Sequence, residues 1–247
     1  MVDSVDCLLE KYGGETVIRA LRPFLTERRR ERIEEVLSAR LASLTVAIEN
    51  LHDPHNGAAA IRSLEGFGLQ QLHVVEATEP FVCSSAVTIS AEKWISMRRH
   101  ADFDTCAADL REQGFQLLAM VPRLGHERAV MIEEVDVSRP LACIFGNERD
   151  GLAAESVAAC DVEVTLPMHG FTQSFNLSVS VALVVQELSR RRRLEIGAEG
   201  DLSGEERARL RARWYALSVQ HAEAILKQSV SGLTHENVGE FPHEEEE

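Results

Sequence analysis

The spacing of apolar residues changes near residue 44, and the change separates two kinds of structure. Residues 4 to 41 place apolar side chains at helical intervals, and Thr26 begins a charged helix. The apolar stripe of that helix comprises Ile33, Val36, Leu37 and Leu41. This pattern predicts a helical N-terminal segment over residues 1–42.

Five short apolar runs then have the length and composition of buried strands. They are LTVAIEN (44–50), LHVVE (72–76), FQLLAMV (115–121), LACIFG (141–146) and VEVTLP (162–167). The segments between them are long enough for helices, and such alternation is typical of an α/β domain with a mainly parallel sheet.

The last predicted strand is followed by a long helix from Ser174 to Arg193, whose segment 177–188 is apolar on most sides. Such a helix would pack on the sheet or against a partner subunit. A second helix is expected after Asp201 in a C-terminal extension over 196–229. Its apolar side comprises Trp214, Leu217, Ala224 and Ile225. From 230 to 247 the composition predicts a disordered acidic tail, because it lacks the apolar area that offsets ordering entropy.

Composition narrows the class of protein. The 247 residues are 45% hydrophobic, enough for a globular core. No apolar run approaches the roughly 18 to 20 residues of a membrane helix, and the first ten residues lack the basic and apolar regions of a signal peptide. The five cysteines form no CxxC pair, so we expect reduced thiols in a cytoplasmic protein without membrane attachment.

The net charge of −14 argues mildly against a nucleic-acid partner, but 23 of the 26 basic residues are arginines and many are clustered. The clusters comprise Arg28, Arg29, Arg30 and Arg32; Arg190 to Arg193; and Arg207, Arg209, Arg211 and Arg213. Arginine suits phosphate binding, so the clusters could form a phosphate-facing surface. Interleaved glutamates leave a second interpretation open, in which the clusters are solvated helix faces with ion pairs.

Three segments place polar residues and glycines after predicted strands, where ligands bind in open α/β sheets. The first is ENLHDPHNGAAAIRSLEGFG (49–68), in which Arg62 lies six residues after Asn56. Two interpretations of this pair remain open. Both residues could contact a ligand, or Asn56 could cap the next helix and Arg62 could pair with Glu65.

The second segment is FGNERDGL (145–152), in which Glu148 lies between two glycines. The third is LPMHGFTQSFNLSVSVAL (166–183), in which Ser174 and Asn176 open the long helix. The amides at the start of that helix could bind an anion or a polar ligand, or Ser174 could be its cap.

Together, the order, spacing and strand context of these segments resemble the SpoU (TrmH-like) branch of the SPOUT RNA methyltransferases. The resemblance covers residues 43–195, and its motifs are Asn-x5-Arg, G-x-E-x-x-G and L-P-M-x-G-x-x-x-S-x-N. Phe175 stands where the family usually has Leu. The flanking helices resemble those of members that modify tRNA more than those of members that modify rRNA.

The resemblance implies an α/β fold with a trefoil-knotted, mainly parallel sheet flanked by helices, and a homodimer that binds S-adenosyl-L-methionine. By matched position, Met120, Gly146, Leu166 and Phe175 would contact this cofactor. The residues implied in catalysis are Arg62, Asn56, Glu148, Ser174 and Asn176.

The implied reaction is 2′-O-methylation of a tRNA ribose, at guanosine 18 of the D-loop. Arg28, Arg29, Arg30, Arg32, Arg190 and Arg191 would bind the RNA backbone. Methylation at another tRNA or rRNA site, or RNA binding without catalysis, is the alternative. His52, His55 and His169 lack accompanying ligand spacing, so no metal is expected.

Overall fold

The computed structural model describes residues 4–77, 81, 88, 90–123 and 125–236. The chain divides into two compact units. Residues 38–202 form one unit, and residues 1–37 and 203–247 together form the other. The helical segments expected at the two ends of the chain therefore belong to one unit.

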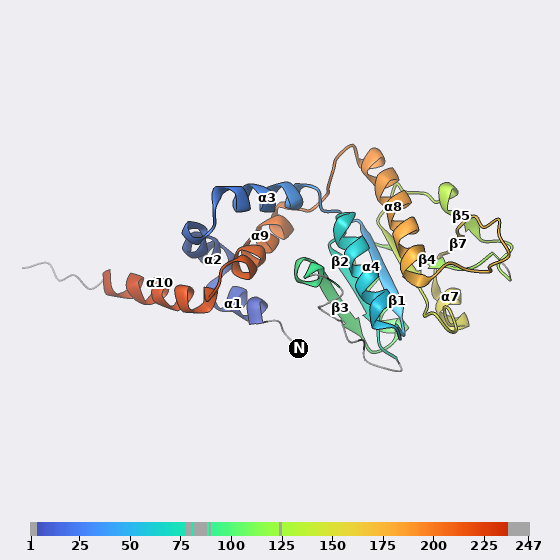
Figure 1. Cartoon of the computed structure of the whole chain (residues 1–247), viewed down its shortest axis with the longest axis horizontal. Coiled ribbons are helices and arrows are strands. Elements are labelled where there is room, and N and C mark those ends of the chain that lie inside the picture. The colour runs from blue at the N-terminus through green and yellow to red at the C-terminus, as the bar shows by residue number, and fades with distance from the viewer. Residues whose placement is uncertain (1–3, 78–80, 82–87, 89, 124, 237–247) are drawn as a thin grey trace, which may run out of the picture. The chain divides into compact units, whose positions relative to one another are not determined.

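The larger unit contains a seven-stranded sheet in the order β3-β2-β1-β6-β4-β7-β5 (Figure 1). Its strands are β1 (Leu44–Glu49), β2 (Gln71–Val75), β3 (Ser96–His100), β4 (Gln116–Met120), β5 (Val130–Met131), β6 (Leu141–Phe145) and β7 (Val162–Thr165). Each neighbouring pair is parallel. The predicted α/β class is confirmed, and so are the five predicted strands. β3 and β5 were not predicted, because β3 is a polar edge strand and β5 has only two residues.

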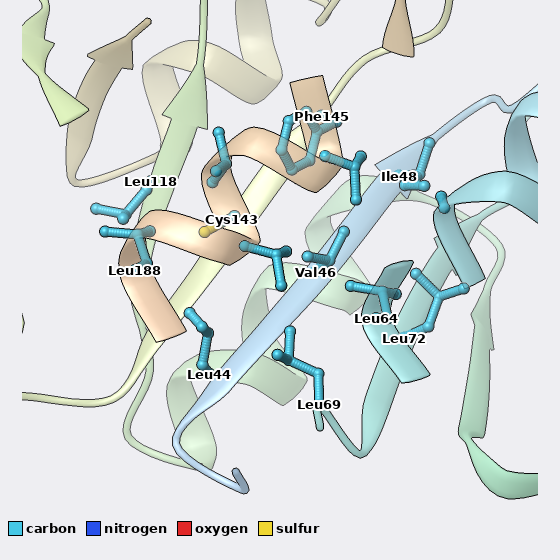
Figure 2. Close-up of a cluster of buried hydrophobic side chains, with 14 of the residues drawn as sticks. Leu44, Val46, Ile48, Leu64, Leu69, Leu72, Leu118, Cys143, Phe145 and Leu188 are labelled. Carbon is cyan, nitrogen blue, oxygen red and sulfur yellow. The ribbon is translucent and has the colours of Figure 1, made fainter. Parts of the chain in front are cut away.

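Helices cover both faces of this sheet. On one face, α4 (Pro54–Gly66) and α8 (Leu177–Ile196) enclose an apolar cluster that contains Val46, Ile48 and Phe145 from the strands, Leu64 from α4 and Leu188 from α8 (Figure 2). On the other face, α6 (Phe103–Glu112) packs against β1, β4 and β6, and α7 (Ala154–Ala159) lies beside the end of β4. The short helices η2 (Ala91–Trp94) and η3 (Ile132–Glu134) complete the unit.

The parallel arrangement places the carboxyl ends of β1, β6 and β7 at the same edge of the sheet. The three polar segments follow these strands directly: α4 after β1, a tight loop after β6, and a glycine-containing loop leading to α8 after β7. The sheet therefore brings residues more than 90 positions apart to one place.

The smaller unit is helical. It contains α1 (Ser4–Tyr12), α2 (Gly14–Leu21), η1 (Arg22–Phe24), α3 (Glu27–Ser38), α9 (Gly204–Ser218) and α10 (Ala222–Glu236). Val17, Leu21, Leu210 and Trp214 are buried in it. Nowhere in the described ranges is a helix both long and apolar enough to cross a membrane.

Two expectations about the C-terminal segment are wrong. Ala224 and Ile225 do not continue the helix of Trp214, because α9 ends at Ser218 and His221 adopts a left-handed backbone with φ of 58° before α10. Residues 230–236 are helical rather than disordered, and the rest of the expected tail, 237–247, lies outside the described residues.

Candidate active site

Asn56 joins all three polar segments. It is 8% exposed in the first turn of α4, where its Nδ2 donates to Glu148 Oε1 at 2.7 Å. Its Oδ1 accepts a hydrogen bond from Asn176 Nδ2 at 3.0 Å. Asn56 is not the cap of α4, because Asp53 accepts the backbone N–H of His55 in that role. The carboxamide of Asn56 is therefore free to bridge the second and third segments.

The loop after β6 is closed on itself and presents Glu148. The backbones of Asn147 and Gly151 exchange two hydrogen bonds of 3.2 Å, and Asn147 Oδ1 accepts from two further amides of the turn. A Cβ atom on Gly146 would lie 1.9 Å from the carbonyl carbon of Gly151, so only glycine fits there. This turn holds the Glu148 backbone beside the start of α4.

Glu49 anchors the far side of the same loop, although it was not singled out from the sequence. It ends β1 with only 6% of its surface exposed, and its carboxylate accepts from Ser156 Oγ at 2.9 Å and from the Ala153 amide at 3.3 Å. The signal was its acidic character at the end of an otherwise apolar strand.

Asn176, not Ser174, caps α8. Asn176 Oδ1 accepts from the amide and the hydroxyl of Ser178, at 2.9 and 2.7 Å. Ser174 lies two residues earlier, in the loop that lines a neighbouring cavity. One side chain therefore both starts the long helix and positions Asn56.

The cavity has a volume of about 470 Å³, which is in the range of small-molecule sites. Its wall contains all four residues expected at the cofactor, Met120, Gly146, Leu166 and Phe175, and also Glu148 and Ser174. His126 and Gln173 line it as well and were not predicted. His126 Nδ1 lies 2.7 Å from Glu163 Oε2, which fixes its ring.

Arg62 is exposed on α4 and does not form the ion pair with Glu65 that was one interpretation. Glu65 instead binds the buried Arg40, with 2.9 Å between Nη2 and Oε1. In the part of the chain that the structure describes, Arg62 forms no hydrogen bond or ion pair. Its guanidinium is available to a ligand.

Most arginines of the three clusters form hydrogen bonds or ion pairs with other residues of the protein. Arg191 donates to the carbonyls of Ile132 at 2.9 Å and Val135 at 2.5 Å, so the geometry favours a structural role and counts against its expected contact with RNA. Arg190 pairs with Glu187.

In the smaller unit, Arg30 and Arg32 pair with glutamates of α3, and Arg29 binds Ser218 Oγ. Arg211 and Arg213 of the third cluster also pair with acids. Arg28 is exposed and forms no such bond within the described ranges.

The cavity is large enough for a small molecule, and it lies with the polar network at the carboxyl edge of a parallel sheet. These features define the class of the protein: an α/β protein that binds a small molecule beside reactive side chains. The chain belongs to the SpoU rRNA Methylase family, whose model matches residues 43–186.

Individual relatives agree with this assignment. The chain is 31% identical over 208 residues to a tRNA (guanosine(18)-2′-O)-methyltransferase of Borreliella burgdorferi, covering 84% of this chain and 94% of that protein. It resembles the structure of the A. aeolicus TrmH/SpoU tRNA modifying enzyme with a TM-score of 0.70 and 28% identity, covering 78% of this chain and 98% of the other. An AdoMet-bound rRNA methyltransferase from Sinorhizobium meliloti has a TM-score of 0.55 and 25% identity, with 62% and 58% covered.

Proposed function

We propose that this protein transfers a methyl group from S-adenosyl-L-methionine to the 2′-oxygen of guanosine 18 in the D-loop of tRNA. The observation that carries the proposal is the hydrogen-bonded set Asn56, Glu148 and Asn176 beside a cavity of about 470 Å³. The tRNA substrate and the nucleotide are taken from the relative of B. burgdorferi, which covers nearly the whole of both chains.

The cavity fits the proposed cofactor. Met120, Leu166 and Phe175 provide apolar surface for a purine ring, and the turn at Gly146 brings backbone close to the ligand. Phe175 is 39% exposed, so its ring can contact a ligand without leaving an apolar core. When bound, S-adenosyl-L-methionine supplies a methyl group on a positively charged sulfur, which is already an activated donor.

A ribose hydroxyl is a poor nucleophile, so the protein must orient it and stabilise the charge that develops on its oxygen. We assign the second task to Arg62. An arginine side chain stays protonated at neutral pH, so Arg62 acts as a hydrogen-bond donor to the 2′-oxygen and a neighbouring phosphate rather than as a base. The proton leaves to Glu148, a phosphate or water.

The remaining polar residues orient the reacting groups. Asn56 holds the Glu148 carboxylate through its carboxamide, and Asn176 donates to that carboxamide in turn. Ser174, in the cavity wall, contacts the ribose of the target nucleotide.

We further propose a cytoplasmic homodimer. The trefoil knot of the chain stays a prediction.

Transfer of labelled methyl from S-adenosyl-L-methionine to unmodified tRNA transcripts tests the proposal. We expect label in a transcript with guanosine at position 18 and none in a transcript with 2′-deoxyguanosine there, because the reacting hydroxyl is missing. Equal labelling of both transcripts would place the reaction at another nucleotide. Labelling of rRNA alone would show a different substrate, and cofactor binding without any transfer would show a non-catalytic RNA-binding protein.

A further inference from the structure

A second group of chemically reactive side chains lies at the opposite edge of the sheet from the cavity, between β2, β3 and α6. The register of β2 and β3 pairs His73 with Arg98 and Val75 with His100, so the two histidines project from the same face of the sheet. Cys106 and Asp109 are three residues apart on α6, so they share one helix face. The fold thus places two imidazoles, a thiol and a carboxylate together.

The ligand atoms of three of these side chains lie close enough together to hold one ion between them. A hydrogen bond of 2.9 Å joins His73 Nδ1 and His100 Nε2, and Asp109 Oδ2 lies 3.8 and 3.9 Å from these two nitrogens. Cys106 Sγ and one ring nitrogen of each histidine lie within 4.8 Å of one another. Neighbouring ligand atoms of a tetrahedral zinc ion are about 3.3 to 3.8 Å apart, given metal–ligand bonds of about 2.0 to 2.3 Å. A bound ion would therefore replace the hydrogen bond between the two rings and move their nitrogens further apart.

We propose that His73, His100, Cys106 and Asp109 bind one zinc ion, which joins the edge strand β3 to β2 and α6. This donor set of nitrogen, sulfur and oxygen is the set that zinc prefers. The site is separate from the methyl-transfer cavity and from His52, His55 and His169.

The burial of the group supports a ligand. The side chain of His73 is 0% exposed, and Nδ1 is the ring nitrogen that lies near His100 and Asp109. A bond from His73 to a metal would offset part of the cost of burying this polar ring. The side chain of His100 is 10% exposed, which gives an ion a route to the site.

The protonation states of the proposed ligands and the residues around them are compatible with a zinc ion. Burial lowers the pKa of His73 to about 4 and also lowers that of His100, so both rings are in the neutral form that binds metals. Burial raises the pKa of the Cys106 thiol to about 12, so binding must release its proton. Arg98 Nη1 donates to both carboxylate oxygens of Asp109 at 3.1 Å, and Gln113 Nε2 donates to Oδ1 at 3.0 Å, so these two outer partners orient the carboxylate.

Titration of the chelator-stripped, full-length protein with Co²⁺ tests the site, because cobalt replaces zinc and reports thiolate ligation by a charge-transfer band in the near ultraviolet. We expect this band to saturate at one equivalent per chain and to disappear when Zn²⁺ is added. Cys106→Ser should abolish the band. Cys7→Ser, which removes an exposed thiol elsewhere, should leave it unchanged.

Thermal unfolding gives a second readout that does not depend on methyl transfer. One equivalent of Zn²⁺ should raise the melting temperature of the wild type and leave that of His100→Gln unchanged, since zinc bound only to the native state stabilises it. Absence of the thiolate band in the wild type would overturn the proposal even if every variant failed to fold. Persistence of the band in a folded Cys106→Ser variant would also overturn it.

Discussion

Arg62 lies six residues after Asn56 on α4, and its side chain is exposed and forms no hydrogen bond or ion pair in the described part of the chain. We predict that Arg62→Ala lowers the single-turnover rate of methyl transfer by about 100-fold or more, the size found when a donor to a developing oxyanion is removed. Cofactor affinity, measured by calorimetry, should change little because Arg62 does not line the cavity. Arg62→Lys keeps the charge and should retain part of the rate. Equal rates in Arg62→Ala and the wild type would exclude this role.

Asn56 acts through its two partners. Asn56→Ala would leave the Glu148 carboxylate without a donor and the Asn176 amide without an acceptor. We expect the free energy of unfolding to fall by about 1 to 3 kcal/mol and turnover to fall at least tenfold. Urea unfolding and methyl-transfer assays measure the two effects. Ser63→Ala on the same helix, which removes only a bond to the Ala59 carbonyl, is the control and should keep full turnover.

The sequence predicted these residues individually but not their contacts. Asn56, Glu148 and Asn176 belong to segments that follow different strands, and only the strand order and register bring them together. Local pattern left the two helix caps open, because Asn56 and Ser174 are both good capping residues. Asp53 and Asn176 occupy the capping positions instead, since each lies where the chain turns from extended to helical backbone.

At the level of elements, the C-terminal half of α8 is fixed by arginines that sequence analysis assigned to RNA or solvent. Arg192 is 9% exposed and donates to the Val137 carbonyl and to Ser43 Oγ, both at 2.8 Å. Arg193 binds the carbonyls of Ala39 and Phe67. These side chains bind α8 to the loops that precede and follow the strands of the sheet. Composition could not predict this role, because it depends on contacts between residues far apart in the sequence.

We therefore predict a large difference between neighbouring arginines. Arg192→Gln should lower the free energy of unfolding by about 2 to 3 kcal/mol, because it leaves buried acceptors unpaired. Arg190→Gln carries the same change in charge but breaks only a half-exposed pair with Glu187, so the loss should be below about 1 kcal/mol. Urea unfolding of both variants gives the comparison. Similar losses would show that the buried bonds of Arg192 contribute little.

On the scale of the whole molecule, the net charge of −14 would repel RNA, which is also negatively charged. A substrate of this kind therefore requires a local basic surface. Ion pairs within the units neutralise many arginines, so the basic surface is smaller than the clusters suggest. Arg28, Arg29 and Arg30 are consecutive on α3; Arg28 is exposed, Arg29 donates to Ser218 Oγ and Arg30 pairs with Glu27.

If these three arginines contact phosphates, replacing all three by Gln should weaken tRNA binding and reduce the slope of log affinity against log salt by about two to three. Filter-binding or fluorescence titrations at several salt concentrations measure this slope. Replacement of all three by Lys keeps the charge and should keep the slope. A slope that is the same in the wild type and the Gln variant would show that the cluster is a solvated helix face.

The proposed homodimer concerns the outer face of α8. Val179 and Leu183 lie one turn apart there and are 44% and 42% exposed, whereas Val181, Val184 and Leu188 of the same helix are buried in the core. Leu183→Asp would place a charge in the subunit interface, so we expect sedimentation velocity to show a monomer and methyl transfer to fall with it. Phe24→Asp, at a 59% exposed apolar position of the smaller unit, is the control and should remain dimeric. A wild type that sediments as a monomer at micromolar concentration, or a dimeric Leu183→Asp variant, would contradict the assignment of this face.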